Sequence, residues 1–195
     1  MHTEKSTAQD IVSAGIAVRP QSAEGVGAGG VYTVVCHDAN GNMKWSDSFH
    51  NLVVNQGLQD MNSKYFSGSG YTAAWFLGLV TGPGSGTTFA AGDTLASHAG
   101  WTENTAYTGT RKAATFGTAT TADPSVINNA VATGGTPAVF TMSSNAQTIA
   151  GAFLCSVTSG TSGILFSAGD FTGGDKLVDS GDTLTVTYTF SLDAA

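Results

Sequence analysis

The stretch LASHAGWTENTAY, residues 95–107, holds the side chains best suited to chemistry in a chain that has few charges. His98 could transfer a proton or bind a metal, Glu103 could act as a base, and Trp101 could stack on a sugar ring. A zinc site takes three or four ligands, usually His, Cys or carboxylates, and no second His or Cys lies nearby in the sequence. Ser97 next to His98 is not a triad pattern, because adjacent side chains on a strand point to opposite faces.

We therefore interpret this stretch as a loop-to-strand corner. Gly100 permits the bend, Trp101 covers an edge of the core, and residues 102–107 begin the outgoing strand. His98 and Glu103 are expected to hydrogen-bond across the corner or to face a neighbouring subunit.

Other candidate sites have weaker patterns. Residues 82–88, GPGSGTT, lack the lysine of a phosphate-binding loop, and no GxSxG nucleophile motif occurs. Four aspartates in a Gly-rich loop lack the ligand rhythm of an EF-hand, so we expect solvated turn residues, with a loose calcium site as the alternative; they are Asp170, Asp175, Asp179 and Asp182. The sequence thus predicts no catalytic, cofactor-binding or metal-binding residue.

The three tryptophans leave a sugar-binding role open. Trp45 and Trp75 lie within strand patterns, which is typical of core residues, whereas Trp101 lies in a loop. Cys36 and Cys155 are expected to be buried thiols in strands, with a disulfide as the less favoured alternative.

Composition excludes several classes of protein. The chain has 195 residues, seven Lys and Arg, and a net charge of −7, which argues against nucleic-acid binding. No apolar run approaches the roughly 20 residues of a membrane span, and the N-terminus lacks a secretory signal pattern, so we expect synthesis and use in a cytosol. Charged residues make up only 11%, which favours burial of the surface against other protein subunits.

The chain is predicted to have two parts. Residues 1–30 contain IVSAGIAV, then Pro20, then the glycine-rich SAEGVGAGG, and are expected to form a flexible or partner-ordered arm. Residues 31–195 are expected to form one β-domain.

Strand patterns dominate this domain. VYTVVCHD and MKWSDSF predict a hairpin, with a type I′ turn at Asn40-Gly41. Leu58, Met61 and Tyr65 are spaced for one face of a short helix. AAWFLGLV is typical of a buried strand, residues 105–121 suggest one or two exposed strands, and four more β runs follow. About eight strands with almost no helix predict an antiparallel β-sandwich, with the jelly roll as the form we expect.

With the phrases CHDANGNMKWSDSFHNLVVNQGL, AAWFLGLV, DTLASHAGWTENTAY, IAGAFL and DTLTVTYTF in view, the chain resembles tailed-bacteriophage virion structural proteins over residues 30–192. The resemblance implies a non-enzymatic head decoration or cement protein, made in the host cytoplasm and bound to the capsid exterior. Its implied partners are the major capsid protein and copies of itself, as a homodimer or homotrimer, with no nucleic acid, membrane or cofactor. The alternative is a tail- or fibre-associated protein that binds a host receptor or glycan.

Overall fold

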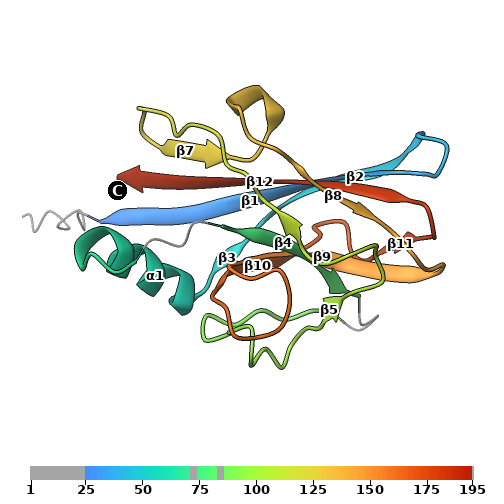
Figure 1. Ribbon diagram of the computed structural model, residues 1–195, viewed down its shortest axis with the longest axis horizontal. Coiled ribbons are helices and arrows are strands. Elements are labelled where there is room, and N and C mark those ends of the chain that lie inside the picture. Colours follow the sequence, from blue (N-terminus) through green and yellow to red (C-terminus); the bar gives the residue numbers. More distant parts are fainter. Residues whose placement is uncertain (1–24, 71–73, 83–85, 195) are drawn as a thin grey trace, which may run out of the picture.

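The computed structural model describes residues 25–70, 74–82 and 86–194, and the described chain is mainly β (Figure 1). Residues 1–24 of the predicted arm lie outside the described residues. In chain order the elements are β1 Val26–His37, β2 Met43–His50, β3 Leu52–Val53, α1 Asn55–Phe66, β4 Phe76–Thr81, β5 Glu103–Asn104, β6 Lys112–Ala113, β7 Ser125–Asn128, the short 3-10 helix Val131–Thr133, β8 Ala138–Thr141, β9 Gln147–Cys155, β10 Leu165–Asp170, β11 Lys176–Val178 and β12 Thr183–Ala194.

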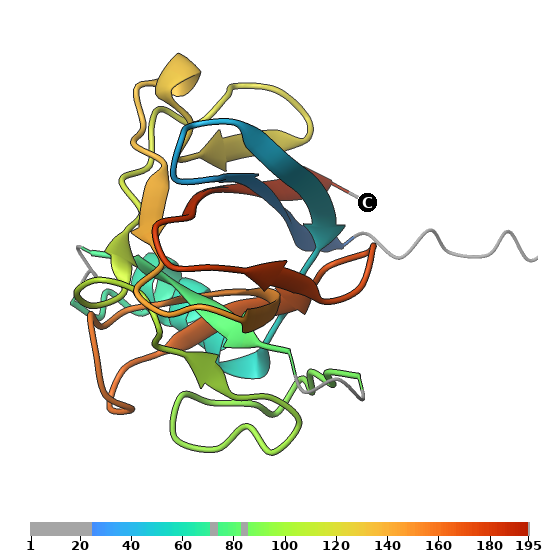
Figure 2. The same cartoon turned by 90° about the vertical axis from the view of Figure 1, so that its right-hand side faces the viewer.

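The strands form two antiparallel sheets that face each other (Figure 2). The first sheet has the order β2-β1-β12-β7, and β8 also pairs with β12. The second has the order β3-β10-β9-β4-β5, with β11 beside β9 and β6 beside β4. This arrangement confirms a mainly β chain with antiparallel sheets, as the strand patterns predict.

The core between the sheets follows from alternating side chains. In β12, Leu184, Val186 and Tyr188 are fully buried, whereas the threonines between them are half-buried on the other face. In β1, the even-numbered residues Tyr32 and Val34 face the same core. The predicted half-buried last strand is therefore confirmed.

A second, smaller core lies on the outer face of the second sheet. It contains Phe153 and Cys155 of β9, Leu165 of β10, and Leu95 and Trp101 from the long loop before β5. Because β9 contributes to both cores, seven consecutive residues, 149–155, are buried. This double burial explains why β9 reads as a continuous apolar run.

The β1–β2 hairpin forms where it was expected, but its turn is different. A type I′ turn needs a positive φ at both of its central residues. Of Asn40 and Gly41, only Gly41 has one, +85°, so the predicted type I′ turn is wrong. The Asp38 side chain instead accepts hydrogen bonds from the backbone N–H groups of Asn40 and Asn42, both at 2.8 Å. The Asp38 carboxylate thus satisfies backbone N–H groups of the turn, as aspartate side chains commonly do.

The predicted helix is confirmed as α1, but the side chains on its inner face differ from the expected ones. Gly57 is buried, and Met61 packs against the main core. Tyr65 is 84% exposed and Leu58 is 40% exposed, so the predicted apolar face is wrong at these two positions. The reason is that Gly57, which has no side chain, faces β10 and lets the helix come close to that strand. A Cβ at this position would lie 2.5 Å from the carbonyl oxygen of Phe166.

The described chain begins its first strand inside the predicted arm. β1 starts at Val26, and residues 26–30 pair with residues 190–194 of β12. The prediction that the arm extends to residue 30 is therefore wrong for these five residues. A long partner strand supplies backbone hydrogen bonds that compensate for the low strand preference of glycine.

Candidate functional site

The stretch 95–107 forms a packed corner over the second core. Trp101 is 4% exposed, and its indole N–H donates to Asp93 at 3.0 Å. The ring of His98 stacks on Trp101 at 3.9 Å between centroids, and its Nδ1 lies 2.9 Å from the Trp101 carbonyl oxygen. Gly100 has no positive φ; it is needed because a Cβ there would lie 2.1 Å from the Thr88 hydroxyl.

His98 and Glu103 both hydrogen-bond at this corner, as expected, but with different partners: His98 contacts the Trp101 carbonyl oxygen. Glu103 instead forms a two-pronged ion pair with Arg111, at 2.9 Å from Nε and 2.7 Å from Nη2. The side chain of Arg111 is only 5% exposed, and its guanidinium also donates to the carbonyl oxygen of Val157 at 3.2 Å. The expected outgoing strand is limited to β5, so the ion pair, more than strand pairing, fixes this corner.

Arg111 was missed by sequence reasoning. An arginine in a Thr- and Gly-rich stretch reads as a surface residue, because charged side chains are rarely buried. Burial lowers the pKa of Arg111, but the hydrogen bonds and charge of Glu103 outweigh it, and the pKa is raised overall. Burial and the negative charge of Glu103 likewise raise the pKa of Tyr107, whose hydroxyl lies 3.4 Å from the same carboxylate.

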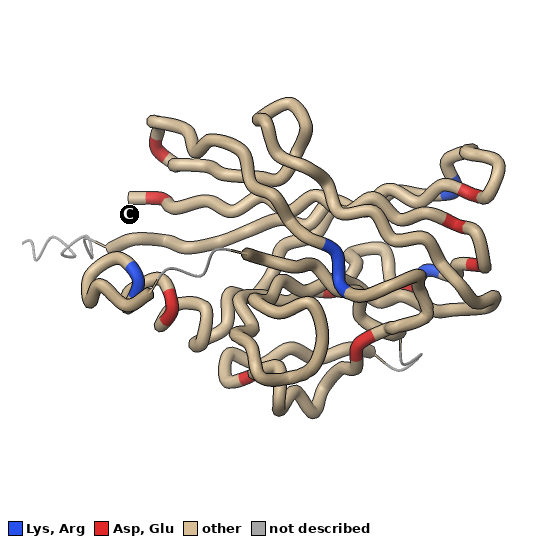
Figure 3. Tube along the Cα trace, viewed as in Figure 1, with Lys and Arg blue, Asp and Glu red and all other residues tan. Residues whose placement is uncertain are grey.

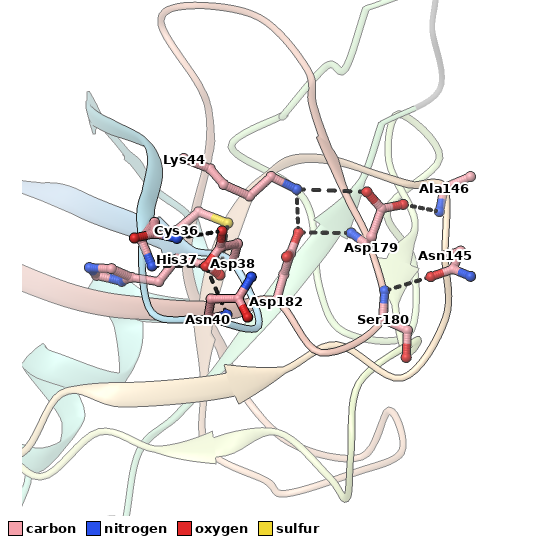
Figure 4. A network of polar contacts seen from close by, with 11 residues as sticks. Cys36, His37, Asp38, Asn40, Lys44, Asn145, Ala146, Asp179, Ser180 and Asp182 are labelled. Carbon is pink, nitrogen blue, oxygen red and sulfur yellow. Dashed lines mark hydrogen bonds and ion pairs between the residues drawn. The ribbon is translucent and has the colours of Figure 1, made fainter.

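Two of the four loop aspartates form a network with Lys44 of β2 (Figure 4). Asp182 is 3% exposed and accepts from Lys44 at 2.6 Å and from the backbone N–H of Asp179 at 2.9 Å. The hydrogen bond to Asp182 raises the pKa of Lys44. The prediction of a solvated turn residue is therefore wrong for Asp182, which ties the β1–β2 hairpin to the start of β12.

The three tryptophans do not share a surface. Trp45 packs edge-on against Phe171, and Trp75 packs edge-on against Phe166, both within the main core region. Trp101 is buried, so it cannot stack on a sugar while its loop keeps this structure. This packing agrees with the expected place of Trp101 at a core edge and does not support the sugar-binding alternative that the sequence left open.

Cys36 and Cys155 are free, buried thiols in β1 and β9, as the strand patterns predict. They belong to different cores on opposite sides of the second sheet. Burial, followed by the negative charge of Asp182, raises the pKa of Cys36 to about 11.

An apolar groove runs along α1 in the described part of the chain, and we call it the α1 groove. It consists of two adjoining hollows of about 250 and 530 Å³ that share Met61 and Lys64. The inner hollow is lined by residues of both sheets, and the outer hollow by residues at the start of β1 and the end of β12. In the ribbon, α1 lies beside these two strand ends (Figure 1). The lining residues of the groove are Asp60, Met61, Lys64, Trp75, Phe116, Ile127, Leu154, Phe166, Tyr188 and Phe190 in the inner hollow, and Val26, Asn62, Tyr65, Phe66 and Leu192 in the outer one.

Apolar side chains at the outer hollow are unusually exposed. Val26 is 73% exposed, Tyr65 84% and Phe66 79%, and the two aromatic rings pack edge-on against each other at 5.0 Å. The charges near the groove are Asp60 and Lys64, which form an ion pair at 3.6 Å on the helix. A groove with this lining is suited to binding apolar side chains.

A buried polar network lies behind the inner hollow. The Tyr188 hydroxyl, at the wall of the hollow, accepts from the Asn51 side chain at 2.8 Å and lies 3.4 Å from the Ser167 hydroxyl. Ser167 also bonds to the Tyr32 hydroxyl at 2.7 Å. Burial raises the pKa of both tyrosines, so the network stays neutral and joins the two sheets rather than supplying a base.

The described residues contain no group of three His, Cys, Asp or Glu side chains placed to hold a metal ion. No helix in the described part of the chain has the length and apolarity to cross a membrane. Charged residues are sparse along the trace (Figure 3). Comparisons with protein-family models, with curated proteins and with solved structures find no match.

Proposed function

We propose that the protein is a non-enzymatic virion structural protein of a tailed bacteriophage, a capsid decoration or cement protein. In this role it clamps neighbouring major capsid subunits on the capsid exterior and stabilises the head, as a homodimer or homotrimer made in the host cytoplasm. The sequence resemblance suggests the role. The observation that carries it is the exposed apolar surface of Val26, Tyr65 and Phe66 on a chain with few charges.

A clamp needs surface that can leave water at low cost. Aromatic rings contribute large apolar areas to an interface, and their burial carries no cost of removing charges from water. Tyr65 and Phe66 lie at the end of α1, where they can enter a pocket on a neighbour while the sandwich stays rigid. Jelly-roll winding belongs to the same proposal, and the pairing of the first long strand, β1, with the last, β12, supports it.

Particles that carry or lack the protein test the role directly. Capsids that lack it should lose their DNA at a lower temperature, because the bonds between subunits are fewer. Particles that resist heat and internal pressure equally well without it would overturn the cement role.

A pair of variants then tests the surface. The double substitution Tyr65→Ser with Phe66→Ser should weaken binding to capsids at least ten-fold and leave the isolated fold intact, because both side chains are exposed. The control is Leu177→Ser, which removes a side chain that is 60% exposed on β11, away from α1. Equal binding by both variants would exclude the α1 surface as the contact.

A further inference from the structure

The inner hollow of the α1 groove is an apolar space of about 250 Å³ beside the main core, against which Met61 and Phe190 pack. Its walls come from three parts of the fold. α1 contributes Met61, the second sheet Leu154 and Phe166, and the first sheet Ile127 and Phe190. An apolar cavity of about 150 Å³ is large enough to hold benzene. The inner hollow therefore has room for a guest molecule of one or two rings.

Aromatic rings make up much of the lining of the inner hollow. Trp75 and Phe190 each pack edge-on against Phe166, with 5.3 Å between the ring centroids. Phe116 packs edge-on against Tyr188 at 6.3 Å. Trp75, Phe116 and Phe190 are only half-buried, so part of each side chain is still open to contact. A further ring in the hollow would extend these edge-to-face contacts, which favours an aromatic guest over a saturated one.

The charged groups of the inner hollow neutralise each other. Among the described lining residues these groups are Asp60 and Lys64, one turn apart on α1, which form an ion pair at 3.6 Å. Lys64 also donates to the carbonyl oxygen of Gly70. Because both charges already have partners, a charged guest would leave water without gaining an ion pair, at a large cost in free energy. The hollow therefore favours an uncharged guest.

We propose that the inner hollow binds a small, uncharged aromatic molecule of one or two rings. Such a guest exchanges contacts with water for contacts with the rings of Trp75, Phe166 and Phe190, which is the arrangement that favours apolar ligands in preformed pockets. Tyr65 and Phe66 line the outer hollow and not the inner one. Binding in the inner hollow therefore does not depend on the proposed function, which uses the surface of these two residues.

Toluene added to the full chain tests the class of guest. We expect saturable binding of one toluene molecule per chain, which should raise the unfolding temperature as the toluene concentration rises. Benzylammonium has a similar shape but carries a charge, and it should bind at least ten-fold more weakly. Methylcyclohexane has the same carbon skeleton without the aromatic system, and it should bind several-fold more weakly. Lack of saturable toluene binding, or equal binding of either control compound, would overturn the proposal.

The tryptophans report where toluene binds. Trp75 lines the inner hollow, whereas Trp101 is buried in the second core on the outer face of the second sheet. In a toluene titration followed by NMR, the indole N–H signal of Trp75 should shift through the ring current of the bound toluene, and that of Trp101 should stay in place. The variant Trp75→Phe assigns the first signal. Equal shifts of both signals, or a shift of Trp101 alone, would overturn the proposed place of binding.

A pair of filling variants separates the two hollows. Ile127→Trp adds bulk to the inner hollow, and the matched control Leu192→Trp adds bulk to the outer one. Both positions are half-buried on strands, and circular dichroism checks that both variants fold. Ile127→Trp should weaken toluene binding at least ten-fold, whereas Leu192→Trp should keep it. If Ile127→Trp does not fold, Phe116→Trp, in the loop before β7, replaces it as the filling variant. Equal toluene binding by the filling variant and the control would overturn the proposal.

Discussion

Glu103→Gln should destabilise the protein by about 3 to 5 kcal/mol, the cost of leaving a buried charge without its partner. The side chain of Arg111 is 5% exposed and that of Glu103 22%, so solvent screens the pair weakly. A glutamine side chain is nearly isosteric with glutamate, yet it lacks the negative charge on which both guanidinium contacts depend. Urea unfolding followed by tryptophan fluorescence measures the change.

Two companion variants separate the ion pair from the packing. Arg111→Met keeps much of the aliphatic volume, and the double variant should be less destabilised than the sum of the two single variants, with a coupling energy of about 1 to 3 kcal/mol. The control Asp170→Asn changes an exposed carboxylate at the end of β10 and should stay within about 0.5 kcal/mol of the parent. A loss below about 1 kcal/mol for Glu103→Gln would match an exposed pair and refute the reasoning.

Three further substitutions or measurements test the packing. Trp101→Ala should cost about 3 to 5 kcal/mol in urea unfolding because it empties a site in the second core; a loss below about 1 kcal/mol would mean that the side chain is not packed. Gly57→Ala should destabilise the protein by about 1 to 3 kcal/mol although alanine favours helices, since its Cβ would meet the Phe166 carbonyl oxygen at 2.5 Å, whereas Gln59→Ala on the exposed side should be nearly neutral. Cys36 should resist thiol reagents at pH 8 in the folded protein and react fully in urea. Burial raises its pKa to about 11, above the value of about 8.5 for an unfolded chain. The contribution of the protonated thiol to stability is therefore complete below pH 8.5 and is lost as the pH rises through 11. Rapid labelling of the folded protein at pH 8 would contradict this burial.

Local patterns predicted the elements more reliably than the contacts between them. The hairpin, the buried β4 and the last strand were predictable because alternation along a strand records which face meets water. β11 was not predicted, because its three residues are too short for a period to show. The turn after β1 was predicted wrongly because Asp38, two residues before Asn40, offered the backbone a competing set of hydrogen bonds.

The candidate site was less accessible to sequence reasoning. Met61 was placed on the helix correctly, but the α1 groove also needs β12 residues, and nothing local indicates that residues 61 and 192 line one hollow. Lys44 and Asp182 are likewise 138 positions apart. Buried charges such as Arg111 look the same in sequence as surface charges, because their burial depends on a partner that only the fold supplies.

By itself the sequence determined the mainly β character of the chain, the position of α1 and most strands, and the low charge of the chain. The tertiary structure alone decided that LASHAGWTENTAY is a packed corner in which Glu103 pairs with Arg111, and that an apolar groove lies beside the start of β1. The physical reason is one of range. Strand alternation is set by the backbone over a few residues, whereas ion pairs and grooves depend on which distant strands become neighbours.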